Sequence, residues 1–376
     1  MKLAMPSETR PGETRVALTP ETVGRLVKGD LEVAVQAGAG QSAFHSDEAY
    51  RQAGATVVDN PAALADADVV LSIWPPSAES PVPASGQVLV SMLTPLTDHE
   101  TVRRLAGANV ASFALDMVPR ITRAQSMDVL SSMATIAGYR AVIAAAARMA
   151  KMTPMMMTAA GTIRPANAMV IGAGVAGLQA IATAKRLGAV VTAVDVRPAV
   201  REQIESLGAK FVPMEVDHSA QDAGGYATDL GEDFYKGEQD ILAPYIKNSD
   251  LVVSTAQIPG KPAPKLITET MLGSMKPGSV IVDLAAGTGG NTTVTAADQE
   301  VVHEDILVLA PTNLPAQVPV HASEMFSKNI ESFLKEIIRE GQLNFDLDNE
   351  VITGTLITRN GEVVHERTAA AMEQAS

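Results

Sequence analysis

A glycine-rich segment carries the clearest chemical signal in the chain, and it reads Gly172-Ala173-Gly174-Val175-Ala176-Gly177. The apolar run Ala168–Ile171 before it predicts a strand, and Val175–Leu187 predicts a helix. In this pattern the first glycine permits a tight turn, the second lets a pyrophosphate approach the backbone, and the third lets helix and strand pack closely. The helix N-terminus adds free N–H groups and a partial positive charge. The segment predicts a dinucleotide site; the alternative is a helix packed on a sheet with coincidental glycines.

An acidic residue completes the fingerprint. Asp195 ends the predicted strand Val190–Asp195 and lies 23 residues after Gly172. A carboxylate here accepts hydrogen bonds from the adenosine ribose hydroxyls and repels a 2′-phosphate, which favours NAD(H) over NADP(H). Val196 comes next and then Arg197, whose guanidinium is able to accommodate a 2′-phosphate. The sequence alone therefore favours NAD(H) while leaving NADP(H) open.

Two further segments of the chain are candidates for contact with the dinucleotide. Thr255, Ala256 and Gln257 come directly after the predicted strand Leu251–Ser254, at a carboxyl end where open α/β sheets bind ligands. The polar stretch from Asp217 to Tyr226 contains adjacent glycines, a composition that suits a mobile lid or an ordinary surface loop.

Composition excludes several other classes of function. The formal net charge is −14 and the pI is near 4.9, so nucleic acid is not expected as a partner. The chain has no cysteine, and its six histidines lack metal-ligand spacing, so no metal site is predicted. The longest uncharged stretch, Pro165–Ala184, is interrupted by polar residues and glycines, so we expect no direct membrane insertion.

The elements that must position these residues alternate between strands and helices, which predicts parallel sheets with crossover helices. We predict an α/β fold with two Rossmann-like doubly wound domains, the second being the dinucleotide-binding one. The predicted strands are Lys2–Met5, Leu31–Gln36, Asp68–Ile73, Gln87–Ser91 and Val110–Phe113, then Ala168–Ile171, Val190–Asp195, Lys210–Val212, Leu251–Ser254, Val280–Asp283 and Ile306–Leu309.

Helical patterns set the predicted domain boundaries. A long apolar helix is expected from about Arg123 to Met152 as a buried connector, with Met155, Met156 and Met157 beyond it filling a core. A helix over Pro319–Glu340 returns the chain to the first domain, and Val351–Ile357 with Glu362–His365 predicts a hairpin. Residues 1–128 and 318–376 are expected to form the first domain, and residues 129–317 the NAD(H)-binding domain with its connecting helix. Shorter helices are predicted over Pro20–Val27 and His99–Leu105.

The order of these motifs resembles the family that joins alanine dehydrogenase to the NAD(H)-binding domain of proton-translocating transhydrogenase. The resemblance covers essentially the whole chain. The segment Pro6–Ala17 is similar to both branches, whereas Pro119–Ser132 and Val175–Ala189 are similar to transhydrogenase.

The two branches differ in the chemistry they require. An amino-acid dehydrogenase moves a proton as well as a hydride and must hold a carboxylate, and in alanine dehydrogenases a Lys, a His and an Asp do this. Matching the motifs puts Trp74 (or Ser72), Thr94 and Gly287 at those positions, while Arg15 remains. Hydride transfer between two nicotinamides needs only orientation and exclusion of water, so the resemblance favours transhydrogenase.

The resemblance also implies site residues. Arg120, Gln125, Asp128 and Ser131 would surround the nicotinamide and its ribose, with Arg120 able to pair with Asp128. The alternative is that Gln125, Asp128 and Ser131 merely occupy the start of a helix. The resemblance further implies that a lid carries Gly225 and Tyr226, and that Thr255–Gln257 form a second wall of the cofactor site.

The implied function is a soluble NAD(H)-binding subunit of a proton-translocating transhydrogenase of the Re/Si-specific type. It would pass hydride between NADH and NADP⁺ bound on a partner domain. The implied partners are a second copy, as a homodimer, an NADP(H)-binding domain and a separate membrane-spanning subunit, with a cytoplasmic location at the inner membrane. Two alternatives stay open: an amino-acid dehydrogenase related to alanine dehydrogenase, and a non-catalytic NAD-binding module.

Overall fold

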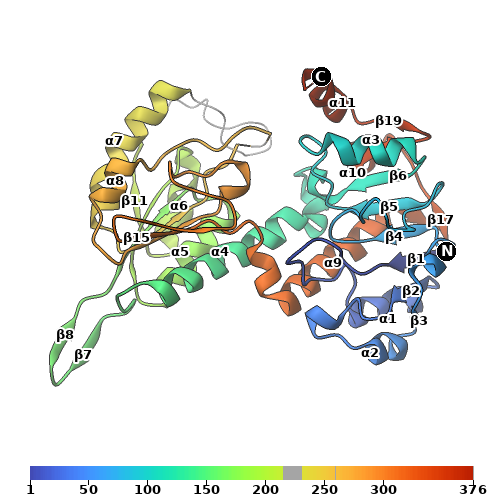
Figure 1. Ribbon diagram of the computed structural model, residues 1–376, viewed down its shortest axis with the longest axis horizontal. Coiled ribbons are helices and arrows are strands. Elements are labelled where there is room, and N and C mark those ends of the chain that lie inside the picture. Colours follow the sequence, from blue (N-terminus) through green and yellow to red (C-terminus); the bar gives the residue numbers. More distant parts are fainter. Residues whose placement is uncertain (215–230, 259, 376) are drawn as a thin grey trace. The chain divides into compact units, whose positions relative to one another are not determined.

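The computed structural model describes residues 1–214, 231–258 and 260–375. The chain divides into two compact units, of which the first comprises Met1–Met133 and Ala316–Ser376 and the second Ala134–Pro315 (Figure 1).

The first unit contains an eight-stranded sheet in the order β19-β18-β6-β5-β4-β1-β2-β3. Strands β1 to β6 follow the 3-2-1-4-5-6 order of doubly wound sheets, and all these neighbours are parallel. The strands are β1 (Lys2–Met5), β2 (Glu32–Gln36), β3 (Thr56–Val58), β4 (Val69–Leu71), β5 (Val88–Ser91), β6 (Ala111–Ala114), β18 (Leu356–Arg359) and β19 (Glu362–Val363). The helices are α1 (Pro20–Lys28), α2 (Asp47–Gln52), α3 (His99–Gly107), α9 (Pro319–Ile337), α10 (Glu350–Thr355) and α11 (Glu366–Gln374).

The C-terminal hairpin differs from its prediction in one part. Asn360 and Gly361 both have positive φ, 53° and 83°, as a two-residue turn between β18 and β19 requires. The residues before β18 were expected to be strand, which is wrong, because they form α10. The side chain of Asn349 accepts the N–H of Val351 and begins this helix.

The second unit repeats the architecture, with a seven-stranded sheet in the order β11-β10-β9-β12-β13-β15-β14. Only β14 runs antiparallel to its neighbour within this sheet. The α/β fold with two Rossmann-like units is therefore confirmed. The strands are β9 (Asn167–Ile171), β10 (Val190–Val194), β11 (Lys210–Val212), β12 (Leu251–Ser254), β13 (Val280–Asp283), β14 (Glu300–His303) and β15 (Ile306–Leu309). The helices are α4 (Val129–Arg148), α5 (Val175–Arg186), α6 (Arg201–Ser206), α7 (Glu232–Asn248) and α8 (Glu269–Gly273).

The long connector helix is shorter than predicted at both ends. Thr122–Met127 form a separate 3-10 segment, and the carboxylate of Asp128 accepts the N–H of Ser131 at the start of α4. Within the described residues, α4 alone is long and apolar enough to cross a membrane by length and composition. One face of α4, with Ala141, Val142 and Ala145, is fully buried in the core of the second unit. Only 39% of its apolar window is buried, so the expectation of a helix buried on all sides is not met.

The methionines after α4 were expected to fill a core, and this is wrong. They belong to a two-stranded hairpin, β7 (Met156–Thr158) and β8 (Gly161–Ile163), that projects from the second unit (Figure 1). Met155 is 59% exposed and Met157 79% exposed. Apolar composition alone cannot distinguish a buried strand from an exposed one.

Candidate dinucleotide-binding site

The glycine-rich turn has the geometry that its sequence predicts. Gly172 follows β9 with φ +88°, and Gly174 precedes the first residue of α5. A Cβ on Gly177 would lie 1.9 Å from the carbonyl oxygen of Gly172, so a side chain there would force α5 away from the turn. A Cβ on Gly174, by contrast, would meet nothing within 4 Å. The second glycine therefore faces open space, which a pyrophosphate is able to occupy.

Asp195 joins the end of β10 to this turn. The residue is 7% exposed, and its Oδ2 accepts the N–H of Ala173 at 2.7 Å. The same carboxylate accepts Nε and Nη2 of Arg197, each at 2.8 Å, and the backbone N–H of Arg197. This hydrogen-bonding raises the pKa of Arg197, whose charge is thereby committed to Asp195. Val196, between them, is half-buried.

The segment Thr255–Gln257 lies directly against the turn. The Thr255 hydroxyl donates to the carbonyl oxygens of Ile171 and Gly172, each at 3.2 Å, and the Thr255 N–H donates to Ile171. Gln257 is exposed and donates to the carbonyl of Leu284 at 2.8 Å. The structure therefore brings the predicted glycines, Asp195 and this segment together at one edge of the sheet.

Glu238 on α7 is a residue that the sequence did not identify. It is 5% exposed, and within the described parts of the chain nothing donates a hydrogen bond to it. Burial, together with a smaller contribution from the charge of Asp195, raises the pKa of its carboxyl to about 7. A largely buried carboxyl with a raised pKa, influenced by the charge of Asp195, makes this end of the sheet a candidate ligand site. Glu238 and Asp195 are far apart in the sequence, so no local sequence pattern predicts that they interact.

The predicted nicotinamide residues lie in the first unit. Arg120 and Gln125 are exposed, and Asp128 and Ser131 are partly buried. The Asp128 carboxylate accepts both the N–H and the hydroxyl of Ser131, at 2.8 and 2.6 Å. The structure thus pairs Asp128 with Ser131 as a helix cap rather than with Arg120. Asn329 on α9 supports the segment by donating to the carbonyl of Ser126 at 2.8 Å.

The two predicted lid residues, Gly225 and Tyr226, lie outside the described residues. In the described ranges, no group of histidine and acidic side chains is arranged to hold a metal ion.

A polar cluster in the first unit, here called the Arg15 cluster, is formed by Arg10, Glu13, Arg15 and Trp74. Arg15 donates through Nε and Nη2 to the two oxygens of Glu13, at 2.7 and 2.6 Å, and their side chains are 2% and 0% exposed. The indole N–H of Trp74 donates to Glu13 at 2.8 Å, and the Arg10 guanidinium lies 4.2 Å from the ring centroid of Trp74. Arg15, the residue kept from the amino-acid dehydrogenase set, is therefore committed to Glu13.

Two carboxyls in this cluster have opposite pKa shifts. Burial alone would raise the pKa of Glu13, but hydrogen bonds and charge from Arg15 outweigh it and lower the pKa to about 2. Burial raises the pKa of Glu8 to about 8, even though Glu8 accepts the N–H groups of Ile73 and Trp74. Ser72, the other matched position, is buried, and its hydroxyl has no hydrogen-bond partner among the described residues.

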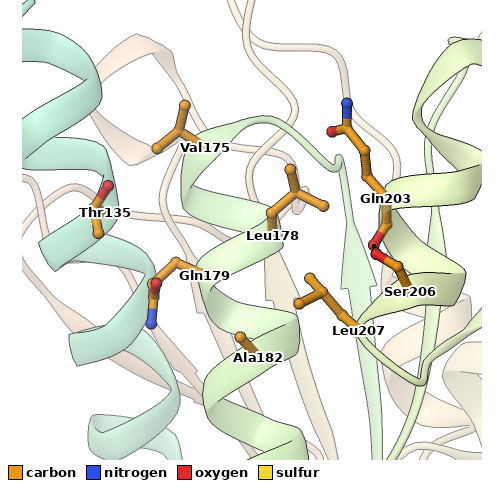
Figure 2. Close-up of a pocket in the computed structure, with 8 residues that line it drawn as sticks. All are labelled: Thr135, Val175, Leu178, Gln179, Ala182, Gln203, Ser206 and Leu207. Atoms are coloured by element: carbon orange, nitrogen blue, oxygen red, sulfur yellow. Dashed lines mark hydrogen bonds between the residues drawn. The ribbon is translucent and has the colours of Figure 1, made fainter.

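An open groove of about 400 Å³ lies between α4, α5 and α6. Figure 2 shows Leu178 and Ala182 of α5 between Thr135 of α4 and Leu207, the residue that follows α6. Among the predicted dinucleotide residues that the structure describes, Val175 alone lines it. The groove therefore touches the glycine-rich segment at Val175 and otherwise lies along the side of α5.

Comparison with known proteins identifies the family. The models described as "Alanine dehydrogenase/PNT, N-terminal domain" and "Alanine dehydrogenase/PNT, C-terminal domain" match residues 4–137 and 141–366. The chain is 46% identical to the first polypeptide of NAD(P) transhydrogenase subunit alpha from Rhodospirillum rubrum, over 97% of this chain and 98% of that protein.

Solved structures agree. The transhydrogenase from Sinorhizobium meliloti has a TM-score of 0.85 and 41% identity, covering 97% of this chain and 99% of that one. A structure of L-alanine dehydrogenase, with a TM-score of 0.82 and 22% identity over the whole of both chains, shares the fold. This chain therefore belongs to the alanine dehydrogenase/PNT family, and within it to the transhydrogenase alpha subunits.

Proposed function

We propose that the chain is the NAD(H)-binding subunit of a proton-translocating transhydrogenase of the Re/Si-specific type. It passes hydride between NADH and NADP⁺ bound on a separate partner domain, and a membrane-spanning subunit couples this transfer to proton translocation. The observation that carries the proposal is the Asp195 carboxylate, which is hydrogen-bonded to the turn at Ala173 and flanked by the open space over Gly174. Bound NADH supplies the hydride, and the protein supplies its position.

The Arg15 cluster favours hydride transfer between nucleotides rather than reduction of a small substrate. A dehydrogenase for a small carboxylate needs a free cation and an acid–base group. Here Glu13 accepts the Nε and Nη2 donors on one edge of the Arg15 guanidinium, and Trp74 also donates to Glu13. Thr94 and Gly287 provide no titratable group at the other matched positions.

The residues that would position the nicotinamide are Arg120, Gln125, Asp128 and Ser131. Arg120 and Gln125 are both exposed at the surface of the first unit. Asp128 and Ser131 hold each other in a fixed geometry at the start of α4, which preserves a carboxylate and a hydroxyl at a defined place. Gly225 and Tyr226, which lie outside the described residues, are proposed as further contacts to the nucleotide.

A second copy of the chain is the proposed direct partner. The hairpin β7–β8 exposes Met155, Met157 and Ile163, the last at 39%. An isolated two-stranded hairpin is marginal in water, and its exposed apolar side chains favour burial against a partner. We assign the complex to the cytoplasmic side of the inner membrane, held there by its partner subunits.

Nucleotide binding tests the cofactor assignment. We expect the isolated chain to quench or shift NADH fluorescence with an affinity at least tenfold above that for NADPH, about 1.4 kcal/mol. A preference for NADPH contradicts the role of Asp195. Mixing the chain with an NADP(H)-binding transhydrogenase domain is expected to give hydride transfer between nucleotides, and its absence favours the non-catalytic module.

The amino-acid dehydrogenase alternative has a direct assay. Pyruvate, ammonium and NADH are supplied to the isolated chain, and NADH oxidation is followed. We expect no turnover, because the first unit offers no free acid–base pair at Ser72, Trp74 or Thr94. Sustained turnover by the chain alone would replace the proposed function with that alternative.

A further inference from the structure

The loop after β13 is wrapped around one buried carboxylate. Asp283 is fully buried, and its Oδ2 accepts the N–H of Asn291 at 2.6 Å, the N–H of Thr292 at 3.1 Å and the hydroxyl of Thr295 at 2.5 Å. Gly290 makes the wrapping possible. Its φ is +81°, and a Cβ there would lie 2.7 Å from the carboxylate oxygen. The backbone of Asn291 is therefore held in one place.

The side chain of Asn291 uses all of its hydrogen-bonding capacity on a different segment. Asn291 is fully buried, and its Oδ1 accepts the hydroxyl of Ser254 at 2.6 Å and the N–H of Ala256 at 3.2 Å. Its Nδ2 donates to the carbonyls of Ala256 at 2.8 Å and Pro264 at 3.0 Å. An amide has two donors and two acceptor positions, and all four are satisfied here.

Ala256 is thus held at both its N–H and its carbonyl by one side chain. It lies two residues beyond the end of β12, where the ladder no longer supports the backbone. The side-chain hydrogen bonds of Asn291 to Ala256 take the place of the missing strand pairing in the segment Thr255–Gln257. This segment packs against the glycine turn.

From this geometry we infer that Asn291, fixed by Asp283, is a positioning residue that preorganises Thr255–Gln257 as a wall of the nucleotide site. The inference rests on the proposed function, since it assigns that wall to the bound NADH. A segment that is already ordered loses little conformational freedom when a ligand binds. The restraint that Asn291 places on Thr255–Gln257 is therefore expected to raise the affinity for NADH. Asn291 itself is buried behind the wall and acts through Ala256.

The test uses Asn291→Asp and Asn291→Ala in the full chain. The aspartate keeps the shape and the acceptor oxygens but loses both donations, to Ala256 and Pro264. Asp250→Ala is the matched control, because Asp250 is 4% exposed and anchors the opposite end of the same strand β12 through the N–H of Asn167 at 2.8 Å. NADH affinity and thermal unfolding are measured for every variant.

We expect both Asn291 variants to bind NADH about tenfold more weakly, the size of one lost preorganising restraint. Asp250→Ala is expected to lower the unfolding temperature while its NADH affinity stays within about twofold of wild type. With the NADP(H)-binding partner present, the Asn291 variants should raise KM for NADH while kcat stays near its wild-type value. Wild-type affinity in both Asn291 variants overturns the inference, as does an equal loss of affinity in Asp250→Ala. Failure of the wild-type chain itself to bind NADH overturns the proposed function instead.

Discussion

Asp195 and Arg197 form a two-pronged ion pair at the end of β10, with Nε–Oδ1 and Nη2–Oδ2 distances of 2.8 Å. Their side chains are 5% and 15% exposed. The pair bears directly on nucleotide choice, which the sequence left open at Arg197. A 2′-phosphate would have to draw the guanidinium away from a carboxylate that also holds the turn through Ala173. The geometry therefore favours a ribose with a free 2′-hydroxyl.

Asp195→Asn is expected to weaken discrimination against NADPH. The amide keeps an acceptor for the Ala173 N–H but no longer repels phosphate, and it releases the Arg197 guanidinium toward a 2′-phosphate. The ratio of the dissociation constants for NADPH and NADH should fall by at least about tenfold, equivalent to 1.4 kcal/mol. Fluorescence titration with both nucleotides measures this ratio. Arg201→Ala, which removes the exposed pair with Glu205, is the control and should leave the ratio unchanged.

Gly174→Ala and Gly177→Ala are expected to have different effects, the first on NADH affinity and the second on stability. A Cβ at Gly174 meets only open space, so that variant is expected to unfold within about 2 °C of wild type while losing NADH affinity by at least about tenfold. A Cβ at Gly177 collides with the Gly172 carbonyl at 1.9 Å, so that variant should lose stability itself. Calorimetry and NADH titration on the two proteins check this. Unchanged NADH affinity in a folded Gly174→Ala protein would argue against a pyrophosphate at the turn.

Much of the fold was predictable, because local signals and global topology agree. The G-x-G-x-x-G turn, its flanking strand and helix, and Asp195 form a unit of about thirty residues whose spacing is fixed by one βαβ crossover. The short edge strands β3 and β14 were missed. They are partly exposed and only three and four residues long, so their sequences carry little hydrophobic periodicity.

The parts that escaped prediction depend on contacts between distant segments. Glu238 is significant only because α7 places it beside Asp195, and Asn291 only because its loop reaches Ala256. The methionine hairpin was read as core, since burial is decided by what a segment packs against rather than by its composition.

Glu238→Gln should change how stability depends on pH. The pKa of Glu238 is about 7 in the folded chain and 4.5 for an ordinary glutamate, so the folded state binds more protons between these values. Stability from this group is therefore full below pH 4.5 and is lost as pH rises through 7, at a cost of about 3 kcal/mol. The glutamine variant avoids this cost. Without nucleotide, its unfolding temperature should exceed that of wild type at about pH 8.5 and match it near pH 5.

Glu269→Gln, an exposed change on the neighbouring helix α8, serves as the control for Glu238 and should show no such crossover. Parallel pH profiles for wild type and Glu238→Gln would show that the Glu238 carboxyl is already charged or solvated in the folded chain.

Glu13→Gln tests how much the ion pair within the Arg15 cluster contributes to stability. The substitution leaves the Arg15 guanidinium buried without its counter-charge, and we expect a loss of about 3–5 kcal/mol in the free energy of unfolding at pH 7. Trp74→Phe removes the indole hydrogen bond to Glu13 and keeps an aromatic ring beneath Arg10, so it should cost about 1 kcal/mol. Urea unfolding of the three proteins measures both differences.

The same variant has a defined pH signature. The pKa of Glu13 is lowered to about 2, so its stabilisation is present above pH 4.5 and is lost as pH falls toward 2. The stability gap between wild type and Glu13→Gln should therefore narrow by about 1.4 kcal/mol for each pH unit below 4.5. A gap that stays constant from about pH 7 to pH 3 would show that packing, and not the charge on Glu13, holds Arg15 in place.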